Sequence, residues 1–172
     1  MALPERPLET EMAADVLALI SGPEKLISVY GGWPSFEDSE VLSVALDRGN
    51  LKEVFETADW DEVVLPSVTV KFFVFDSRVS YDSPARNNRL ATIRFDGIQD
   101  FWLEHFSHQN PIMGLAIHKA KGREDAEQFL EVEWGGTAMA FETKFLCKAI
   151  AVLDVVPFDP SFGTQIIPIE RP

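Results

Sequence analysis

The chain has 172 residues, of which 46% are apolar and 25% are charged. Folding at this length hides roughly 70% of the unfolded surface, so the chain can bury a core of its own. The composition excludes a disordered acidic tail, a collagen-like chain and a disulfide-dense mini-protein. The formal net charge of −13 disfavours nucleic-acid binding and favours encounter with a basic protein. It is equally typical of a surface that keeps a protein soluble.

We expect a soluble, cytoplasmic protein that does not enter membranes. The N-terminus, Met1 to Arg6, lacks the basic-then-apolar order of a secretory signal. No stretch approaches the ~20 apolar residues that span a bilayer. The single Cys147 lies in an apolar run and has no partner for an internal disulfide, which predicts a buried structural thiol.

The N-terminal part of the chain predicts a helical hairpin over residues 7–30. Apolar residues repeat there at the spacing of a helix, at Leu8, Met12, Val16, Leu19 and Ile20. Gly22-Pro23 ends the first helix and opens the second. Ser21 and Glu24 have the spacing of a capping box, and Gly31-Gly32 ends the second helix.

Residues 40–157 predict a mainly antiparallel sheet of about seven strands, because no helix long enough for a parallel crossover separates them. Leu42, Val44 and Leu46 alternate with polar or small residues, which predicts that these three form a buried face. Asp96-Gly97 is typical of a tight turn between two strands. The other expected strands cover 68–75, 91–95, 101–106, 112–118, 130–134 and the long run 137–152.

The expected fold is therefore α+β, with a curved or two-layered sheet and the helical hairpin over one face or edge. Residues 1–172 are expected to form a single domain that ends in an irregular tail, 158–172. Residues 79–88 and 122–127 are polar or charged and are expected to be loops. The 13 Phe residues are expected to fill the faces of the sheet, which ranks a small-ligand pocket last among the functions.

Four residues define the alternative function, a metal-dependent or carboxylate-based hydrolase. His105 and His108 would share a face on a helix and hold a metal ion, whereas on a strand they point to opposite faces. Pro111 favours a turn in which His108 and its neighbours satisfy backbone groups. Asp38 and Glu40 would lie on one face of a strand and divide acid and base roles, or would be a solvated edge.

A second group of residues predicts a protein-binding surface instead of a catalytic site. Trp60 stands among Asp59, Asp61 and Glu62, which is typical of an aromatic anchor with an acidic rim. In the alternative interpretation, Trp60 folds back onto the core. The second set of expected contacts is Glu124, Asp125, Glu127, Glu131 and Glu133.

Three segments resemble the immunity protein 50 family of bacterial proteins, which are assigned as partners of polymorphic toxins. The first is residues 32–43 (GWPSFEDSEVLS) together with 46–48 (LDR), the second is 90–98 (LATIRFDGI) and the third is 106–112 (FSHQNPI). Residues 145–152 show a weaker similarity. The motif residues singled out are Trp33, Pro34, Phe36, Asp38, Glu40, His108, Gln109 and Asn110. The family commonly has His at the place of Glu37 and Asn at the place of Ser107, so we interpret the first motif as structural.

The resemblance implies a role and not a chemistry. We expect a non-enzymatic immunity protein that neutralises a cognate, basic toxin by stoichiometric binding. We expect no catalytic residue, no metal and no cofactor. The net charge fits fast, salt-sensitive capture of such a toxin, with affinity supplied by a few buried aromatic contacts.

Overall fold

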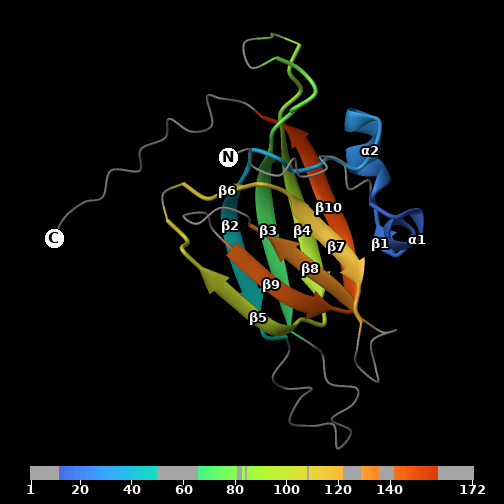
Figure 1. Ribbon diagram of the computed structural model, residues 1–172, viewed down its shortest axis with the longest axis vertical. Coiled ribbons are helices and arrows are strands. Elements are labelled where there is room, and N and C mark those ends of the chain that lie inside the picture. The colour runs from blue at the N-terminus through green and yellow to red at the C-terminus, as the bar shows by residue number, and fades with distance from the viewer. Residues whose placement is uncertain are drawn as a thin grey trace, which may run out of the picture.

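Two β-sheets packed face to face, with two short helices at one edge, make up the fold (Figure 1). The computed structural model describes residues 12–49, 66–80, 83, 85–107, 109–121, 129–135 and 142–158. Its elements are α1 (Ala14–Leu17), β1 (Ile20–Ser21), α2 (Glu24–Tyr30), β2 (Ser39–Asp47), β3 (Ser67–Val74), β4 (Arg89–Asp96), β5 (Gln99–Glu104), β6 (Pro111–Ile112), β7 (Leu115–Lys119), β8 (Leu130–Trp134), β9 (Glu142–Cys147) and β10 (Ala149–Pro157).

The six-stranded sheet has the order β1-β10-β4-β3-β2-β6, and the four-stranded sheet has the order β5-β9-β8-β7. Every pairing among the described strands is antiparallel except that of β1 with β10. The mainly antiparallel sheet predicted from the sequence is therefore confirmed, in its two-layered form. The count is wrong, since the described residues alone form ten strands.

Among the described strands the chain changes sheets four times, and two of these crossings are adjacent corners. One corner follows Asp96, where β4 of the large sheet continues into β5 of the small sheet. The other is Lys148, which joins β9 to β10 and whose N–H donates to the Asp96 carbonyl over 2.8 Å. Gly97 does turn the chain, with φ of 69°, but β5 pairs with β9 and not with β4. The turn expected at Asp96-Gly97 is therefore present, but it joins strands of different sheets, and the expected run 137–152 contains parts of two strands.

The core lies between the sheets and is rich in aromatic rings. Alternate residues of β3, β4, β8 and β9 point inward and are buried. Trp134 of the small sheet contacts Phe72 and Phe95 of the large sheet at centroid distances of 5.6 and 6.0 Å. Phe145 completes the cluster, 5.2 Å from Phe95. Cys147 is buried beside them, as expected, and burial raises the pKa of its thiol to about 12.

The helical hairpin predicted for residues 7–30 is wrong in detail. Residues 7–11 lie outside the described part, and the rest forms two helices of four and seven residues separated by β1. Ile20 belongs to that strand because it pairs with Ile150 of β10. The capping box is absent, since Pro23 occupies the N-cap of α2 without a side-chain hydrogen bond. Gly31 ends α2 as predicted, in a left-handed conformation.

The buried face predicted for β2 is only partly present, because Val44 packs against the core and Leu42 and Leu46 do not. The register with β3 shifts between Val41 and Ser43, so Leu42 is an inserted bulge residue. Leu42 is 43% exposed and Leu46 is 63% exposed, whereas Val41 is fully buried. The extra residue shifts the inward-facing positions of the strand by one. A prediction that assumes regular alternation therefore assigns Leu42 to the wrong face.

Candidate functional site

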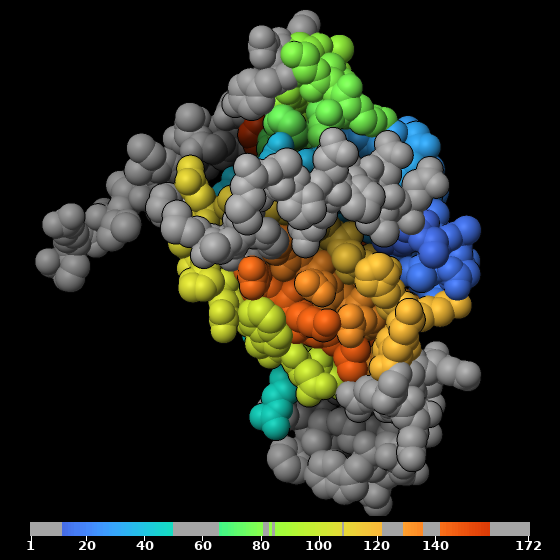
Figure 2. Space-filling model, in the orientation of Figure 1, coloured from blue at the N-terminus to red at the C-terminus, as the bar shows by residue number. Residues whose placement is uncertain are grey.

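The outer surface of the four-stranded sheet, which faces the viewer in Figures 1 and 2, gathers charged side chains around one exposed tryptophan. We call this surface the Trp102 face. Because neighbouring residues of a strand point to opposite sides, the inward-facing Phe101 and Leu103, which pack against the core, leave Trp102 outside. The face consists of Asp100, Trp102, Glu104, Ala116, His118, Glu131, Glu133, Glu142, Lys144 and Leu146.

Trp102 stands on a fixed backbone although its side chain is open to solvent. The residue is 41% exposed and lies opposite Lys144 in the pairing of β5 with β9. The hydroxyl of Thr143, which is only 1% exposed, donates a hydrogen bond to the Trp102 carbonyl. The backbone that carries the ring therefore needs little further ordering when a partner covers it.

Carboxylates outnumber cations on this face. Lys144 is the central cation, with its Nζ 3.0 Å from Glu131 Oε1 and 3.6 Å from Glu133 Oε2. The hydrogen bond that Lys144 donates to Glu131 and the charges of both carboxylates raise the pKa of Lys144. The remaining carboxylates, at Asp100, Glu104 and Glu142, leave the face net negative.

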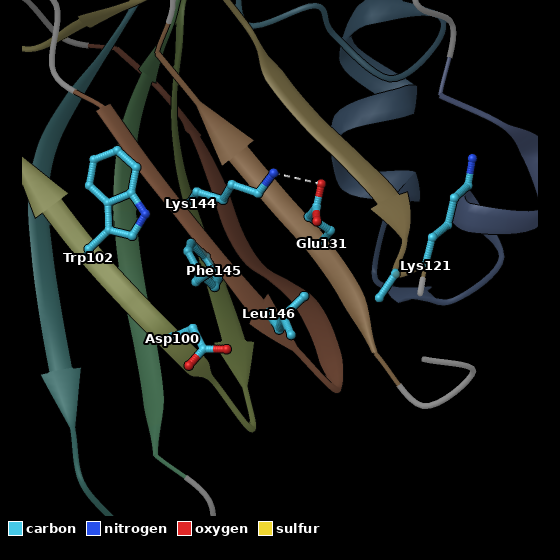
Figure 3. A pocket seen from close by; sticks show the side chains of 8 residues that line it. Asp100, Trp102, Lys121, Glu131, Lys144, Phe145 and Leu146 are labelled. Carbon is cyan, nitrogen blue, oxygen red and sulfur yellow. Dashed lines mark ion pairs between the residues drawn. The ribbon is translucent and has the colours of Figure 1, made fainter. Parts of the chain in front are cut away.

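A hollow of about 270 Å³ opens beside Trp102 (Figure 3). We call it the Trp102 hollow; its lining consists of Asp100, Trp102, Ala120, Lys121, Glu131, Lys144, Phe145 and Leu146. Asp100 borders it from the bulge in β5, where the backbone is left-handed with φ of 55°. Figure 3 shows the Asp100 and Glu131 carboxylates on opposite sides of the hollow, with Leu146 between them.

A second hollow, of about 440 Å³, lies near the turn at Asp38 and is lined by Glu37, Asp38, Phe75, Ser77, Arg78, Val79, Ser80 and Arg86. One of its two basic residues, Arg78, is held in place by Asp76, which is 2% exposed. Arg78 Nε donates to Asp76 Oδ1 over 2.9 Å, and the Arg78 guanidinium also donates to the Tyr30 carbonyl. The Arg78 guanidinium keeps the pKa of the Asp76 carboxyl below its usual range. These contacts fasten the loop after β3 to α2.

The family-motif residues make contacts that shape the start of β2. Phe36 is buried, has a left-handed backbone with φ of 60°, and lies 5.8 Å from the Trp33 ring, which is next to the half-buried Pro34. Asn110, which is 4% exposed, donates from Nδ2 to the carbonyls of Val41 and Ser107 over 3.2 and 3.0 Å. These contacts fix the turn before β6 against β2.

The two carboxylates proposed for the hydrolase have different surroundings. Asp38 is exposed in a turn with φ of 58°, whereas Glu40 Oε1 accepts the N–H of Asn110 over 3.4 Å. His105 is exposed and lies 3.8 Å from Glu104. His108 lies outside the described residues. Among the residues that are described, no three side chains of His, Cys, Asp or Glu are grouped so that they could hold a metal ion.

The predicted binding residues divide into two sets. Glu131 and Glu133 lie on the Trp102 face, on the outer side of β8, and alternate with its buried residues. Gln109, which is a family-motif residue and not one of the predicted contacts, is exposed beside the motif turn. The others, Asp59, Trp60, Asp61, Glu62, Glu124, Asp125 and Glu127, lie outside the described residues.

Sequence reasoning missed Asp100, Trp102 and Glu104. The signal was present, because these three residues alternate with Phe101 and Leu103. The two apolar residues lie on one face of the strand, and the tryptophan lies between two acids on the other face. This pattern predicts that the tryptophan ring is exposed to solvent.

The described residues thus form a β-sandwich with an acidic, tryptophan-bearing outer face. The family model of immunity protein 50 matches residues 22–158, and the chain belongs to this family. The three segments that carried the resemblance all lie inside the match. No curated protein and no solved structure shows significant similarity to the chain. No helix within the described ranges is long and apolar enough to cross a bilayer.

Proposed function

We propose that this chain is an immunity protein that neutralises a cognate bacterial toxin by binding it through the Trp102 face, without catalysis. Membership of the immunity protein 50 family supports the role. The observation that supports this surface is the position of Trp102, which is 41% exposed on β5 between the carboxylates of Asp100 and Glu104. Tryptophan is enriched among the residues that dominate binding energy at interfaces.

The charge of the face supports a basic partner. Carboxylates around the anchor attract a positively charged toxin and repel anionic molecules, so they raise the association rate and the specificity. The affinity then depends on covering Trp102, because exposed ion pairs contribute little. We propose that the chain acts on the toxin in the cytoplasm of the cell that makes both proteins.

The first prediction concerns Trp102→Ala. Truncation of an anchor of this kind costs at least about 2 kcal/mol, which is about thirtyfold in Kd. The measurement is calorimetric titration of the purified protein with the toxin encoded by the neighbouring gene. The control is Leu46→Ala, which removes an apolar side chain that is 63% exposed on β2 of the other sheet and should leave Kd unchanged.

Two results would contradict the proposal. Equal affinity of Trp102→Ala and the unmodified protein would remove the Trp102 face from the interface. Loss of toxin activity without a stoichiometric complex, or with a covalently altered toxin, would overturn binding as the mode of neutralisation.

A further inference from the structure

The outer surface of the six-stranded sheet, on the opposite side of the sandwich from the Trp102 face, carries a row of apolar side chains. Phe73 lies opposite Leu90 in the pairing of β3 with β4, and Leu90 lies opposite Val156 in the pairing of β4 with β10. Val156 is 38% exposed, and Phe73 and Leu90 are half-buried. They point away from the core because their strand neighbours, such as Phe72 and Ala91, point into it and are fully buried. We call this surface the Leu90 face.

Exposed leucines extend the apolar area on both sides of the row. Leu42 is exposed at the bulge in β2. Leu153 is exposed at a second bulge, where the register of β10 with β4 shifts. The ring of Phe158 packs on that of Phe73 with a centroid distance of 4.7 Å and is itself partly exposed. Contiguous exposed apolar side chains of this kind are typical of an interaction surface.

A second row on the same face carries one charge of each sign. Lys71 lies opposite Thr92, and Thr92 lies opposite Asp154. Thr92 thus keeps the two charged residues two strands, or about 10 Å, apart. Both are exposed, and within the described ranges neither side chain forms a hydrogen bond or an ion pair. The neighbouring charges, Arg94 and Asp96, are paired with each other at 3.0 Å.

We propose that the Leu90 face binds the same face of a second copy of this chain, in a dimer whose twofold axis runs along β4. Rotation about this axis exchanges the positions of β3 and β10, which flank β4. Lys71 of each copy then faces Asp154 of the other, and Phe73 faces Val156. Leu90 meets its own counterpart on the axis. The face is therefore complementary to itself in charge and in apolar contact, as a twofold interface requires.

The size and shape of the face suit such a dimer. Two sheets pack face to face about 10 Å apart with their strands within about 30° of each other, and rotation about β4 preserves the strand direction. Four strands spaced ~4.8 Å apart and as long as the eight residues of β3 cover about 500 Å². The two copies together bury about 1,000 Å², which is the lower end for a specific interface. We therefore expect a dimer that dissociates on dilution.

The charges favour a second copy over a basic toxin as the occupant. Two chains with a net charge of −13 repel each other at long range, so they can associate only where charge is balanced. The four charges in the middle of the Leu90 face sum to zero, and the border carboxylates of Glu40 and Asp47 accept backbone N–H groups. A dimer of this geometry leaves both Trp102 faces on the outside. The inference is therefore independent of the proposed function.

Sedimentation velocity of the full-length protein tests the inference. The protein is measured from about 1 μM to about 300 μM in about 150 mM NaCl, which screens the long-range repulsion. We expect the average mass to rise from the 19.3 kDa of one chain towards twice that value. In dilute solution the chain is monomeric, and Asp154 is then exposed to solvent.

Charge reversal tests which residues meet. Lys71→Asp and Asp154→Lys each replace two attractions in the dimer by two repulsions, so each should weaken dimerisation at least about tenfold. An equimolar mixture of the two variants should dimerise again, because the reversed charge in one matches the original charge in the other. Recovery in the mixture also shows that both variants are folded. Lys119→Asp is the matched control, since it makes the same change of charge on β7 of the other sheet and should have no effect.

Four outcomes would overturn the inference. A constant monomer mass would exclude the dimer, and a dimer that tolerates both reversals would place self-association on another surface. A mixture of the two variants that stays monomeric would contradict the twofold arrangement. A monomeric chain whose toxin binding is weakened by Lys71→Asp would assign the Leu90 face to the toxin instead of a second copy.

Discussion

Asp76 shows how a single buried carboxylate organises a surface loop. It is 2% exposed and accepts hydrogen bonds from Arg78 and from the N–H of Asn87, 3.2 Å away. Its own N–H donates to Asn88 Oδ1 over 3.0 Å. The carboxylate therefore joins both ends of the loop between β3 and β4, and its charge is compensated by Arg78.

The second prediction follows from the lowered pKa of Asp76. A carboxyl with a lower pKa in the folded state adds stability that is complete above the unfolded pKa, about 3.9, and is lost as pH falls through the folded value. Asp76→Asn should lower the free energy of unfolding at pH 7 by about 1–3 kcal/mol. It should also remove part of the loss of stability below pH 4.

Urea unfolding between neutral and acidic pH measures both effects. Asp154→Asn is the control, because Asp154 is exposed on β10. Parallel pH profiles for Asp76→Asn and the unmodified protein would contradict the role assigned to this carboxylate.

At the scale of the element, the junction of β1 and α2 depends on Gly22. The residue has φ of 70°, and a Cβ atom added there would lie 2.8 Å from the carbonyl oxygen of Val152 in β10. The same strand is held by Lys25, whose Nζ donates to the carbonyls of Val152 and Leu153 over 3.0 and 2.9 Å. These contacts keep the start of α2 close to β10.

The third prediction is that Gly22→Ala lowers the free energy of unfolding by at least about 1–2 kcal/mol, because the left-handed backbone disfavours a side chain and Val152 obstructs it. Gly32→Ala is the matched control, since a Cβ there meets nothing within 4 Å. Thermal unfolding of the two variants makes the comparison. Equal melting temperatures would contradict the assignment.

The elements differ in how far the sequence predicts them. Alternation identified the buried residues of β8 because Leu130, Val132 and Trp134 pair regularly with both neighbours. It failed for Leu42 of β2 because the bulge there interrupts the period, whereas Leu46 lies opposite the buried Val68 and is nevertheless 63% exposed. It missed β1 because two residues carry no pattern, and only the long-range pairing with β10 defines them. Only part of the candidate site was predicted from the sequence, because Glu131 and Glu133 were among the expected contacts and Trp102 was not.

At the scale of the whole molecule, charge should govern how quickly the partner is found. The formal net charge is −13, and the carboxylates of the Trp102 face concentrate part of it around the anchor. Salt weakens long-range attraction between exposed charges and has less effect on contacts that are already covered.

The fourth prediction is that the association rate constant with the toxin falls at least about tenfold between low salt and about 500 mM NaCl, while the dissociation rate changes little. Surface-based kinetics at several salt concentrations measures both rates. Glu131→Gln combined with Glu133→Gln should flatten the salt dependence, and Asp154→Asn should not. A salt-independent association rate would show that electrostatic attraction does not assist capture.

The adjacent corners after Asp96 and at Lys148 affect how the two sheets can move relative to each other. β4 and β5 form one bent ribbon, β9 and β10 form another, and the two are paired antiparallel from Arg89–Pro157 at one end to Glu104–Glu142 at the other. Sliding one layer over the other would break this double ribbon at its bend, where Lys148 is bonded to Asp96. The bend therefore holds the two sheets in a fixed relative position, and a force that a bound partner exerts on Trp102 is transmitted through β5 to the aromatic core.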